Sequence, residues 1–269
     1  MSSLDTSKLQ DFQELDRLLE SAVVLAPNKK KWLFVIGIEK YDATDNIEYA
    51  TRSAEMFAKI GIKKLGIPKE NSFILLNNEA TQAKIKTNLQ RMLARVKEGD
   101  EVYFYYNGHG VPVANQNFEP FMLAKDSEPD YIGDEKFFAL NNIYGSLSGS
   151  KAGKVVAFVD SCFSGVTDGK AVLKGVAATK MTPKIINFDK EKMVVITAGK
   201  GHQYSNGYNK KGHRMFSFFV MKNILESDEK TINNLFKNIK NETYTASVEE
   251  YGDGRTQEPT IDGNANLGL

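Results

Sequence analysis

The sequence predicts an α/β fold in which helices cover both faces of a mostly parallel β-sheet. Its candidate strands are short, continuous apolar runs, the pattern expected when both faces of a sheet are buried. These runs alternate along the chain with segments whose apolar residues recur at helical spacing. Repetition of strand, helix and strand produces parallel strands joined by right-handed crossovers. The chain has 269 residues, a length that α/β folds often use for one domain.

The first helix is expected at 5–24, because its apolar residues recur at helical spacing and Pro27 follows. Strands are expected where apolar residues run without interruption, at 32–38, 72–76, 101–106, 155–159 and 193–197. Further helices are expected from helical spacing at 47–60, 81–97, 135–147, 213–226 and 230–248. A long loop is expected over 163–190, and a polar tail ends the chain.

Charge and composition exclude several classes of protein. Lys and Arg number 35 against 34 Asp and Glu, a net charge of +1, whereas a dedicated nucleic-acid binder normally carries a basic excess. No apolar stretch approaches the roughly 18 residues of a membrane span, and the first ten residues contain no apolar signal segment. We therefore expect a cytoplasmic protein that binds neither nucleic acid nor membrane. Cys162 is the single cysteine, which excludes an intrachain disulfide and a multi-cysteine zinc site.

Two of the expected strands run directly into polar segments that contain glycine. The strand at 101–106 continues into Asn107-Gly-His-Gly110, and the strand at 155–159 continues into Asp160-Ser-Cys-Phe-Ser-Gly165. Because ligands of open parallel sheets bind beyond the carboxyl ends of the strands, both segments are expected at a binding edge. The glycines let the backbone turn sharply and let another chain approach closely.

A cysteine and a histidine at one such edge are typical of nucleophilic catalysis. A thiolate attacks a carbonyl carbon and needs a nearby base to form near neutral pH. Histidine suits this task and also protonates a leaving amine, because its pKa lies near working pH. Taken singly, a buried cysteine usually serves packing, and a lone histidine is usually a hydrogen-bonded polar residue. The two motifs together favour catalysis by Cys162 and His109, whereas His202 and His213 have no comparable glycine setting.

Over residues 31–269 the chain resembles the metacaspases and orthocaspases, which are the bacterial and protist caspase-like cysteine peptidases. The resemblance is carried mainly by the motifs around His109 and Cys162, which stand 53 positions apart, close to the separation of about 50 in caspases. Supporting segments occur at 34–38, 49–54, 196–198, 214–217 and 257–259.

The resemblance implies a fold, an activity and a set of site residues. The fold would be a three-layer α/β/α domain with a six-stranded, mostly parallel sheet over 29–269. An amphipathic helix within 1–28 would precede it, either as a pro-segment or packed on the sheet. The activity would be that of a cysteine endopeptidase with Cys162 as nucleophile, His109 as general acid/base and a thioester acyl-enzyme. The N–H groups of Gly110 and Cys162 would form the oxyanion hole, and the thiol chemistry would need no metal.

Asp160, two residues before the candidate nucleophile, indicates which peptide bond is cut. True caspases carry Gln-Ala-Cys at this point and cut after aspartate, whereas the matching Asp of metacaspase-like enzymes binds Arg or Lys. We therefore expect cleavage after Arg or Lys, with Asp160, Asn107 and Ser53 as substrate-binding residues. The alternative for Asp160 is that it caps the following turn or helix.

Two positions depart from the family pattern and motivate other interpretations. Ser53 stands where the family usually has a second acid, and Asn107 stands where a small residue such as Ser is common. Both side chains still form hydrogen bonds, but one negative charge is lost, and one hypothesis is that Arg52 pairs with Asp160 in a resting state. The main alternative function is a caspase-fold regulatory or scaffold module with little activity. A third interpretation keeps the peptidase and changes its preference to Asp.

The loop at 163–190 is long for a compact domain, and such loops are often functional. The loop carries Lys170, Lys174, Lys180 and Lys184, and three more lysines stand at 29–31. These lysines are candidate self-cleavage sites for a peptidase that cuts after Lys or Arg. The alternative is that they form a solvated lysine-rich surface. The resemblance also implies calcium activation, for which Asp168 is the candidate ligand; Asp126, Asp130 and Asp134 form no calcium-loop pattern. The expected partners are protein or peptide substrates with Arg or Lys at the cleavage site, and a monomer is favoured.

Overall fold

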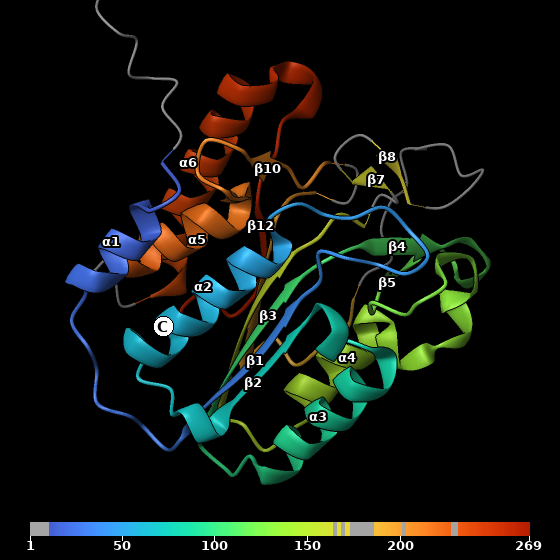
Figure 1. Ribbon diagram of the computed structural model, residues 1–269. Coiled ribbons are helices and arrows are strands. Elements are labelled where there is room, and N and C mark those ends of the chain that lie inside the picture. The colour runs from blue at the N-terminus through green and yellow to red at the C-terminus, as the bar shows by residue number, and fades with distance from the viewer. Residues whose placement is uncertain (1–10, 164–165, 168–169, 173–185, 201–202, 227–230) are drawn as a thin grey trace, which may run out of the picture.

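The computed structural model describes residues 11–163, 166–167, 170–172, 186–200, 203–226 and 231–269. Its main strands are β1 (Lys31–Gly37), β2 (Ser72–Leu76), β3 (Glu101–Asn107), β6 (Lys154–Asp160), β9 (Met193–Thr197) and β12 (Thr260–Gly263). They form one sheet in the order β12-β9-β6-β3-β1-β2 (Figure 1). Strands β1, β2, β3, β6 and β9 run parallel, and β12 pairs antiparallel with β9. The predicted six-stranded, mostly parallel sheet is confirmed.

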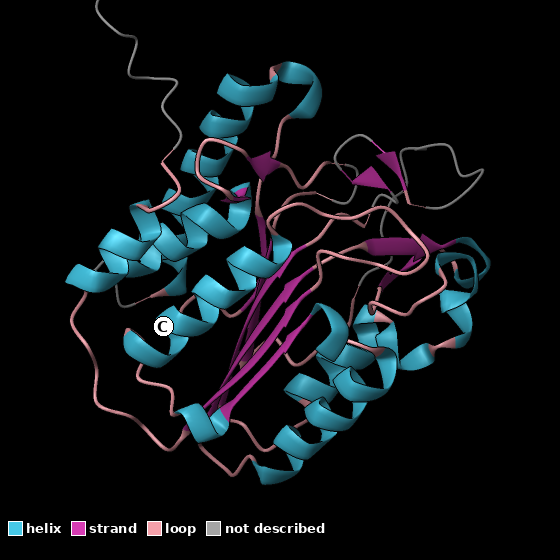
Figure 2. Cartoon of the chain, in the orientation of Figure 1, coloured by secondary structure: helices cyan, strands magenta, loops and turns pink. Residues whose placement is uncertain are grey.

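Helices cover both faces of this sheet and give the three predicted layers (Figure 2). One buried cluster joins the sheet to α1 (Glu14–Ser21), α2 (Ala50–Lys63), α5 (Met215–Glu226) and α6 (Ile232–Tyr251). The other cluster joins it to α3 (Gln82–Arg95) and α4 (Leu140–Ser148). The short α1 packs against α5 and α2, and its role as a pro-segment stays a prediction. No helix within the described ranges is long and apolar enough to cross a bilayer.

Short antiparallel hairpins accompany the main sheet. They are β4 (Gly110–Val113) with β5 (Glu119–Met122), β7 (Val166–Thr167) with β8 (Lys170–Ala171), and β10 (Gly207–Tyr208) with β11 (His213–Arg214). Since β4 follows β3 closely in the chain, its hairpin lies at the carboxyl end of the sheet. Figure 1 shows β4, β5, β7 and β8 together at that end.

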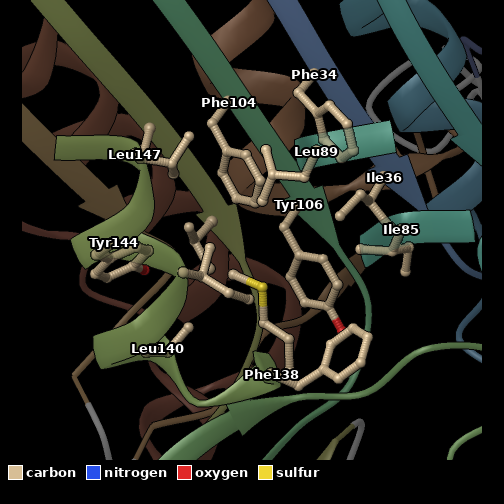
Figure 3. Packing of buried hydrophobic residues seen from close by; sticks show 14 of the residues in the cluster. Phe34, Ile36, Ile85, Leu89, Phe104, Tyr106, Phe138, Leu140, Tyr144 and Leu147 are labelled. Atoms are coloured by element: carbon tan, nitrogen blue, oxygen red, sulfur yellow. The ribbon is translucent and has the colours of Figure 1, made fainter. Parts of the chain in front are cut away.

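Alternate residues of each strand fill two separate cores. In β3, Phe104 and Tyr106 belong to the cluster with α3 and α4, which Figure 3 shows from close by. Tyr103 and Tyr105 belong to the cluster with α2 and α5, where Phe57 stacks on Tyr105 with ring centroids 4.4 Å apart. Because both faces of the strand are buried, both sets of alternate positions hold large apolar or aromatic residues.

Three predicted segments differ from the structure. The first helix, predicted from residue 5, begins at Glu14 within the described residues. The helix predicted at 135–147 begins at Leu140, because the chain before it forms 3₁₀ turns over Pro129–Asp134 and Lys136–Phe138. The predicted polar tail contains β12, a partly exposed strand at the edge of the sheet. β12 has the sequence Thr-Ile-Asp-Gly and lacks the continuous apolar run by which the other five strands were identified.

Gly37 marks a close approach between α2 and the sheet, and it provides a test of this packing. A Cβ atom on residue 37 would lie 2.3 Å from the Cβ atom of Ala54. Gly37→Ala should therefore lower the free energy of unfolding by roughly 1–3 kcal/mol. Gly145→Ala in α4 is the matched control, because no other segment lies within 4 Å of the added Cβ. The control should raise the free energy of unfolding by about 0.5–1 kcal/mol. Urea denaturation measures both variants, and equal stabilities would contradict the packing.

Candidate functional site

The pairing of β3 with β6 determines where the two glycine-containing motifs lie. These strands are parallel neighbours, and Asn107 lies opposite Asp160 in the last pair of their register. His109 and Cys162 each follow that pair by two residues, so both lie at the same edge of the sheet. The Gly108 N–H donates to the Asp160 carbonyl oxygen at 3.4 Å, which joins the two motifs directly.

Gly110 lies against the cysteine-containing segment. A Cβ atom on residue 110 would lie 2.4 Å from ring atoms of Phe163 and 2.7 Å from Ser161 Oγ. Any other residue at this position would displace those side chains, so the close approach requires glycine. The glycine was expected to let a substrate chain approach, whereas the neighbours that the structure shows are Phe163 and Ser161, on either side of Cys162.

His109 is buried and held at both its ring and its backbone. Its Nε2 lies 2.7 Å from the Asp45 carbonyl oxygen, and because a carbonyl can only accept, Nε2 carries a proton in this contact. The Tyr41 ring lies 4.7 Å from the imidazole, centroid to centroid. The His109 N–H donates to Tyr41 Oη at 2.7 Å, and Tyr106 Oη donates to the His109 carbonyl oxygen at 2.5 Å. Burial raises the pKa of Tyr41, so this phenol stays neutral.

Cys162 is almost inaccessible, with 4% of its surface exposed. The backbone N–H of Ser205 donates a hydrogen bond to Cys162 Sγ. Ser205 lies between β9 and β10, far along the chain from the cysteine. The segment that contains Ser205 therefore contacts the sulfur.

Asp160 is 1% exposed and has three hydrogen-bond donors. Its Oδ2 accepts from the Ser217 N–H at 3.0 Å and from Ser217 Oγ at 2.5 Å, and its Oδ1 accepts from Ser205 Oγ at 2.5 Å. Ser217 lies in the first turn of α5, where the helix dipole favours a negative charge. Burial raises the pKa of Asp160, while the charge of Arg214 and the hydrogen bonds from both serines oppose that rise. The carboxylate thus caps a helix distant in sequence, and not the turn that follows it.

Arg214 is the residue of this region that sequence reasoning missed. Its side chain is 1% exposed, and Nη2 donates to both the carbonyl oxygen and the hydroxyl of Ser205, the latter at 3.3 Å. The same hydroxyl donates to Asp160, so Ser205 links the guanidinium to the carboxylate. The sequence offered one signal, since residues 214–217 supported the family resemblance, but nothing in it assigned Arg214 a role.

The other two predicted substrate-binding residues join the same polar cluster. Asn107 Nδ2 donates to Ser217 Oγ at 3.3 Å and to Tyr105 Oη at 3.0 Å, while its buried Oδ1 has no partner within the described ranges. Ser53 Oγ accepts from the Arg214 N–H at 3.0 Å. Asn107 and Asp160 therefore share Ser217, and Ser53 reaches the cluster through the backbone of Arg214.

The hypothesis that Arg52 pairs with Asp160 is wrong. The Arg52 guanidinium donates to the Phe12 carbonyl oxygen at 2.5 Å, lies 3.8 Å from the Asp16 carboxylate and sits over the Phe12 ring. These partners belong to the N-terminal region, and the Arg52 side chain is 43% exposed. The cation near Asp160 is Arg214.

Several predicted residues lie outside the described residues: His202, Asp168, Lys174, Lys180 and Lys184. Among the residues that the structure does describe, no three His, Cys, Asp or Glu side chains are grouped to hold a metal ion. Asp126 instead accepts from the Gln82 N–H at 2.8 Å, next to the first turn of α3. The described residues do not fit a calcium site, and calcium binding by Asp168 stays a prediction.

One comparison identifies the family of this chain, and another finds solved structures with a similar fold. The family model described as Caspase domain matches residues 30–267. Among solved structures, protein GSU0716 from Geobacter sulfurreducens superimposes with a TM-score of 0.62 at 17% identity, covering 90% of this chain and 97% of that one. Caspase-1 from Spodoptera frugiperda superimposes with a TM-score of 0.59 at 12% identity, covering 100% of this chain and 95% of that one. At such low identities the two structures establish similarity of fold. A search of curated proteins finds no match.

His213 gives a pH test of the buried region beside this cluster. Its Nδ1 lies 3.2 Å from Ser53 Oγ, and burial, with a smaller effect from the charge of Arg52, lowers the pKa of His213 to about 3. The folded protein therefore keeps this imidazole neutral at pH values where the unfolded chain, with a pKa near 6.5, takes up a proton. On this basis, acidification from pH 7.5 to pH 5 should lower the free energy of unfolding by about 2 kcal/mol through His213 alone.

The measurement is urea denaturation across this pH range, comparing the wild-type protein with His213→Asn. The variant should lose that part of the pH dependence and keep the part contributed by other groups. Parallel pH profiles for the two proteins would contradict the neutral, buried state of His213.

Proposed function

Because the chain belongs to the caspase-domain family, we propose that it is a cysteine endopeptidase whose catalytic dyad is Cys162 and His109. The observation that supports this most is the register of β3 and β6, which brings both residues to one edge of the sheet. The hydrogen bond between His109 Nε2 and the Asp45 carbonyl oxygen adds support, because it orients the imidazole. A thiol is activated by a base that is held in a fixed orientation beside it.

In the proposed reaction, His109 Nδ1 takes the thiol proton and Cys162 Sγ attacks the carbonyl carbon of the scissile peptide bond. The N–H groups of Gly110 and Cys162 would stabilise the negative oxygen of the tetrahedral intermediate. As the carbon–nitrogen bond breaks, His109 returns the proton to the leaving amine and a thioester remains. His109 then removes a proton from water, the water oxygen attacks the thioester, and the thiol and a carboxylic acid are released.

We infer that the segment at 203–206 moves before a peptide reaches Cys162. The thiol and the imidazole are 4% and 2% exposed, and the Ser205 N–H lies on the sulfur. The activity therefore includes an opening step, which exposes the sulfur before chemistry begins. We infer that this step limits the rate with short peptides, because they offer few contacts to stabilise the open state.

The proposal includes cleavage after Arg or Lys, through a carboxylate at Asp160 that attracts a cationic side chain. Self-cleavage follows from the same preference, with Lys170, Lys174, Lys180 and Lys184 as candidate sites. Cleavage after Asp is the competing preference. Calcium activation is a separate proposal, and it predicts faster turnover of the Arg and Lys peptides with added calcium than with a chelator.

The test is turnover of matched fluorogenic peptides with Arg, Lys or Asp before the scissile bond. Cys162→Ala and His109→Ala should each lower kcat/KM by about 10³-fold or more, because either loss disables the dyad. Gly145→Ala is the control and should retain wild-type turnover, since it alters neither motif. The variants should share the circular dichroism spectrum of the wild-type protein.

Two results would contradict the proposal. Equal turnover by the wild-type protein and Cys162→Ala would remove the catalytic role of the thiol and favour a regulatory or scaffold module. Faster turnover of the Asp peptide than of the Arg and Lys peptides would keep the peptidase and reject its basic preference.

A further inference from the structure

The carboxylate expected to attract a substrate's basic side chain already has partners within the protein. Asp160 accepts one hydrogen bond at Oδ1 and two at Oδ2, all from Ser205 and Ser217. A positive charge is also present, because the buried Arg214 guanidinium donates to the Ser205 hydroxyl that bonds to Asp160. Arg214 lies in β11, immediately before α5, and its backbone N–H donates a hydrogen bond to Ser53 Oγ.

Resting on the proposed peptidase function, we propose that Arg214 is a specificity-determining residue: its guanidinium supplies the positive charge at Asp160 that the Arg or Lys side chain of a substrate would otherwise supply.

The electrostatic argument starts from the cost of burial. An ionised carboxylate in a protein interior is stable when a cation and hydrogen-bond donors compensate for lost water. Arg214, Ser205 and Ser217 provide that compensation, and Asp160, Arg214 and Ser205 are each 2% exposed or less. A second cation approaching Asp160 would gain less from a carboxylate already compensated, and it would be repelled by Arg214. The preference for a basic side chain is therefore weak while Arg214 remains in place.

The same contacts connect this charge balance to access to the thiol. The Arg214 guanidinium donates to the carbonyl oxygen of Ser205, while the N–H of Ser205 donates to Cys162 Sγ. One residue thus contacts the guanidinium, the carboxylate and the sulfur. A substrate side chain that displaces Ser205 from Asp160 would also loosen the cover over Cys162. Removal of Arg214 should accordingly favour both binding of a basic side chain and opening of the segment at 203–206.

Binding to catalytically disabled protein tests the inference without depending on turnover. Every protein carries Cys162→Ala, and the probes are two labelled peptides that differ at one residue, arginine or its uncharged analogue citrulline. Fluorescence anisotropy gives the Kd of each peptide. With Arg214 present, the two Kd values should agree within about threefold; with Arg214→Met, the arginine peptide should bind at least about tenfold more tightly than the citrulline peptide, a difference of about 1.4 kcal/mol.

Arg52→Met is the matched control, because it removes a cation that contacts Phe12 and Asp16 in the N-terminal region and not Asp160. It should leave the ratio of the two Kd values unchanged.

Ser205→Ala is the second variant, needed because Arg214→Met leaves a buried carboxylate without its cation and could unfold the protein. It keeps both charges and removes the linking hydroxyl. The affinity of the arginine peptide, relative to that of the citrulline peptide, should therefore rise by about threefold.

The outcomes separate this inference from the proposed function. An arginine peptide that already binds tenfold more tightly than citrulline with Arg214 present would overturn the inference, as would an unchanged ratio in both Arg214→Met and Ser205→Ala. If the ratios change as expected while the intact thiol turns over none of the peptides, the inference about Arg214 stands and the peptidase proposal fails. If thiol-dependent turnover is present and the ratios stay unchanged, the peptidase proposal stands and the inference fails.

Discussion

The in-register parallel pairing of β3 with β6 is the constraint on which the functional interpretation depends. Hydrogen bonding along the two strands leaves no freedom in how their last residues align, so Asn107 and Asp160 lie side by side. Short segments that contain glycine then position His109 and Cys162, which follow these two residues. Gly108 bonds to the end of β6, and Gly110 lets the histidine-containing segment lie against Phe163. A change of one residue in this register would move the side chains of one strand from each core to the opposite core and would displace the two motifs relative to each other.

His109 and Asp160 are both buried at this edge of the sheet, and different kinds of partners stabilise them. His109 is held by uncharged groups that include the Asp45 carbonyl and the phenols of Tyr41 and Tyr106. Asp160 is held by the start of α5, by two hydroxyls and by the nearby charge of Arg214, which oppose the rise that burial causes in its pKa. The first arrangement orients an imidazole, whereas the second supplies hydrogen-bond donors to a buried carboxyl group.

The sequence was sufficient for the features that depend on local pattern. The strand predicted at 72–76 agrees with β2 at both ends, and the inner strands were found because burial on both faces demands continuous apolar runs. β12 was missed in the tail because its four residues, Thr260–Gly263, include only one apolar side chain. The motifs around His109 and Cys162 could be recognised because each is contiguous. Arg214 and Ser205 could not, since they reach Asp160 only after the chain has folded and their own segments carry no pattern that names a partner.

The pH dependence of Cys162 alkylation tests the central claim most directly, because this residue is the only thiol in the chain. If the fold brings the imidazole of His109 to the sulfur, the rate of modification by iodoacetamide should rise with a midpoint well below the pKa of about 8.5 for a free thiol. His109→Ala should then move the midpoint upward by about one pH unit or more. Midpoints that coincide in the two proteins would show that the two side chains do not act together.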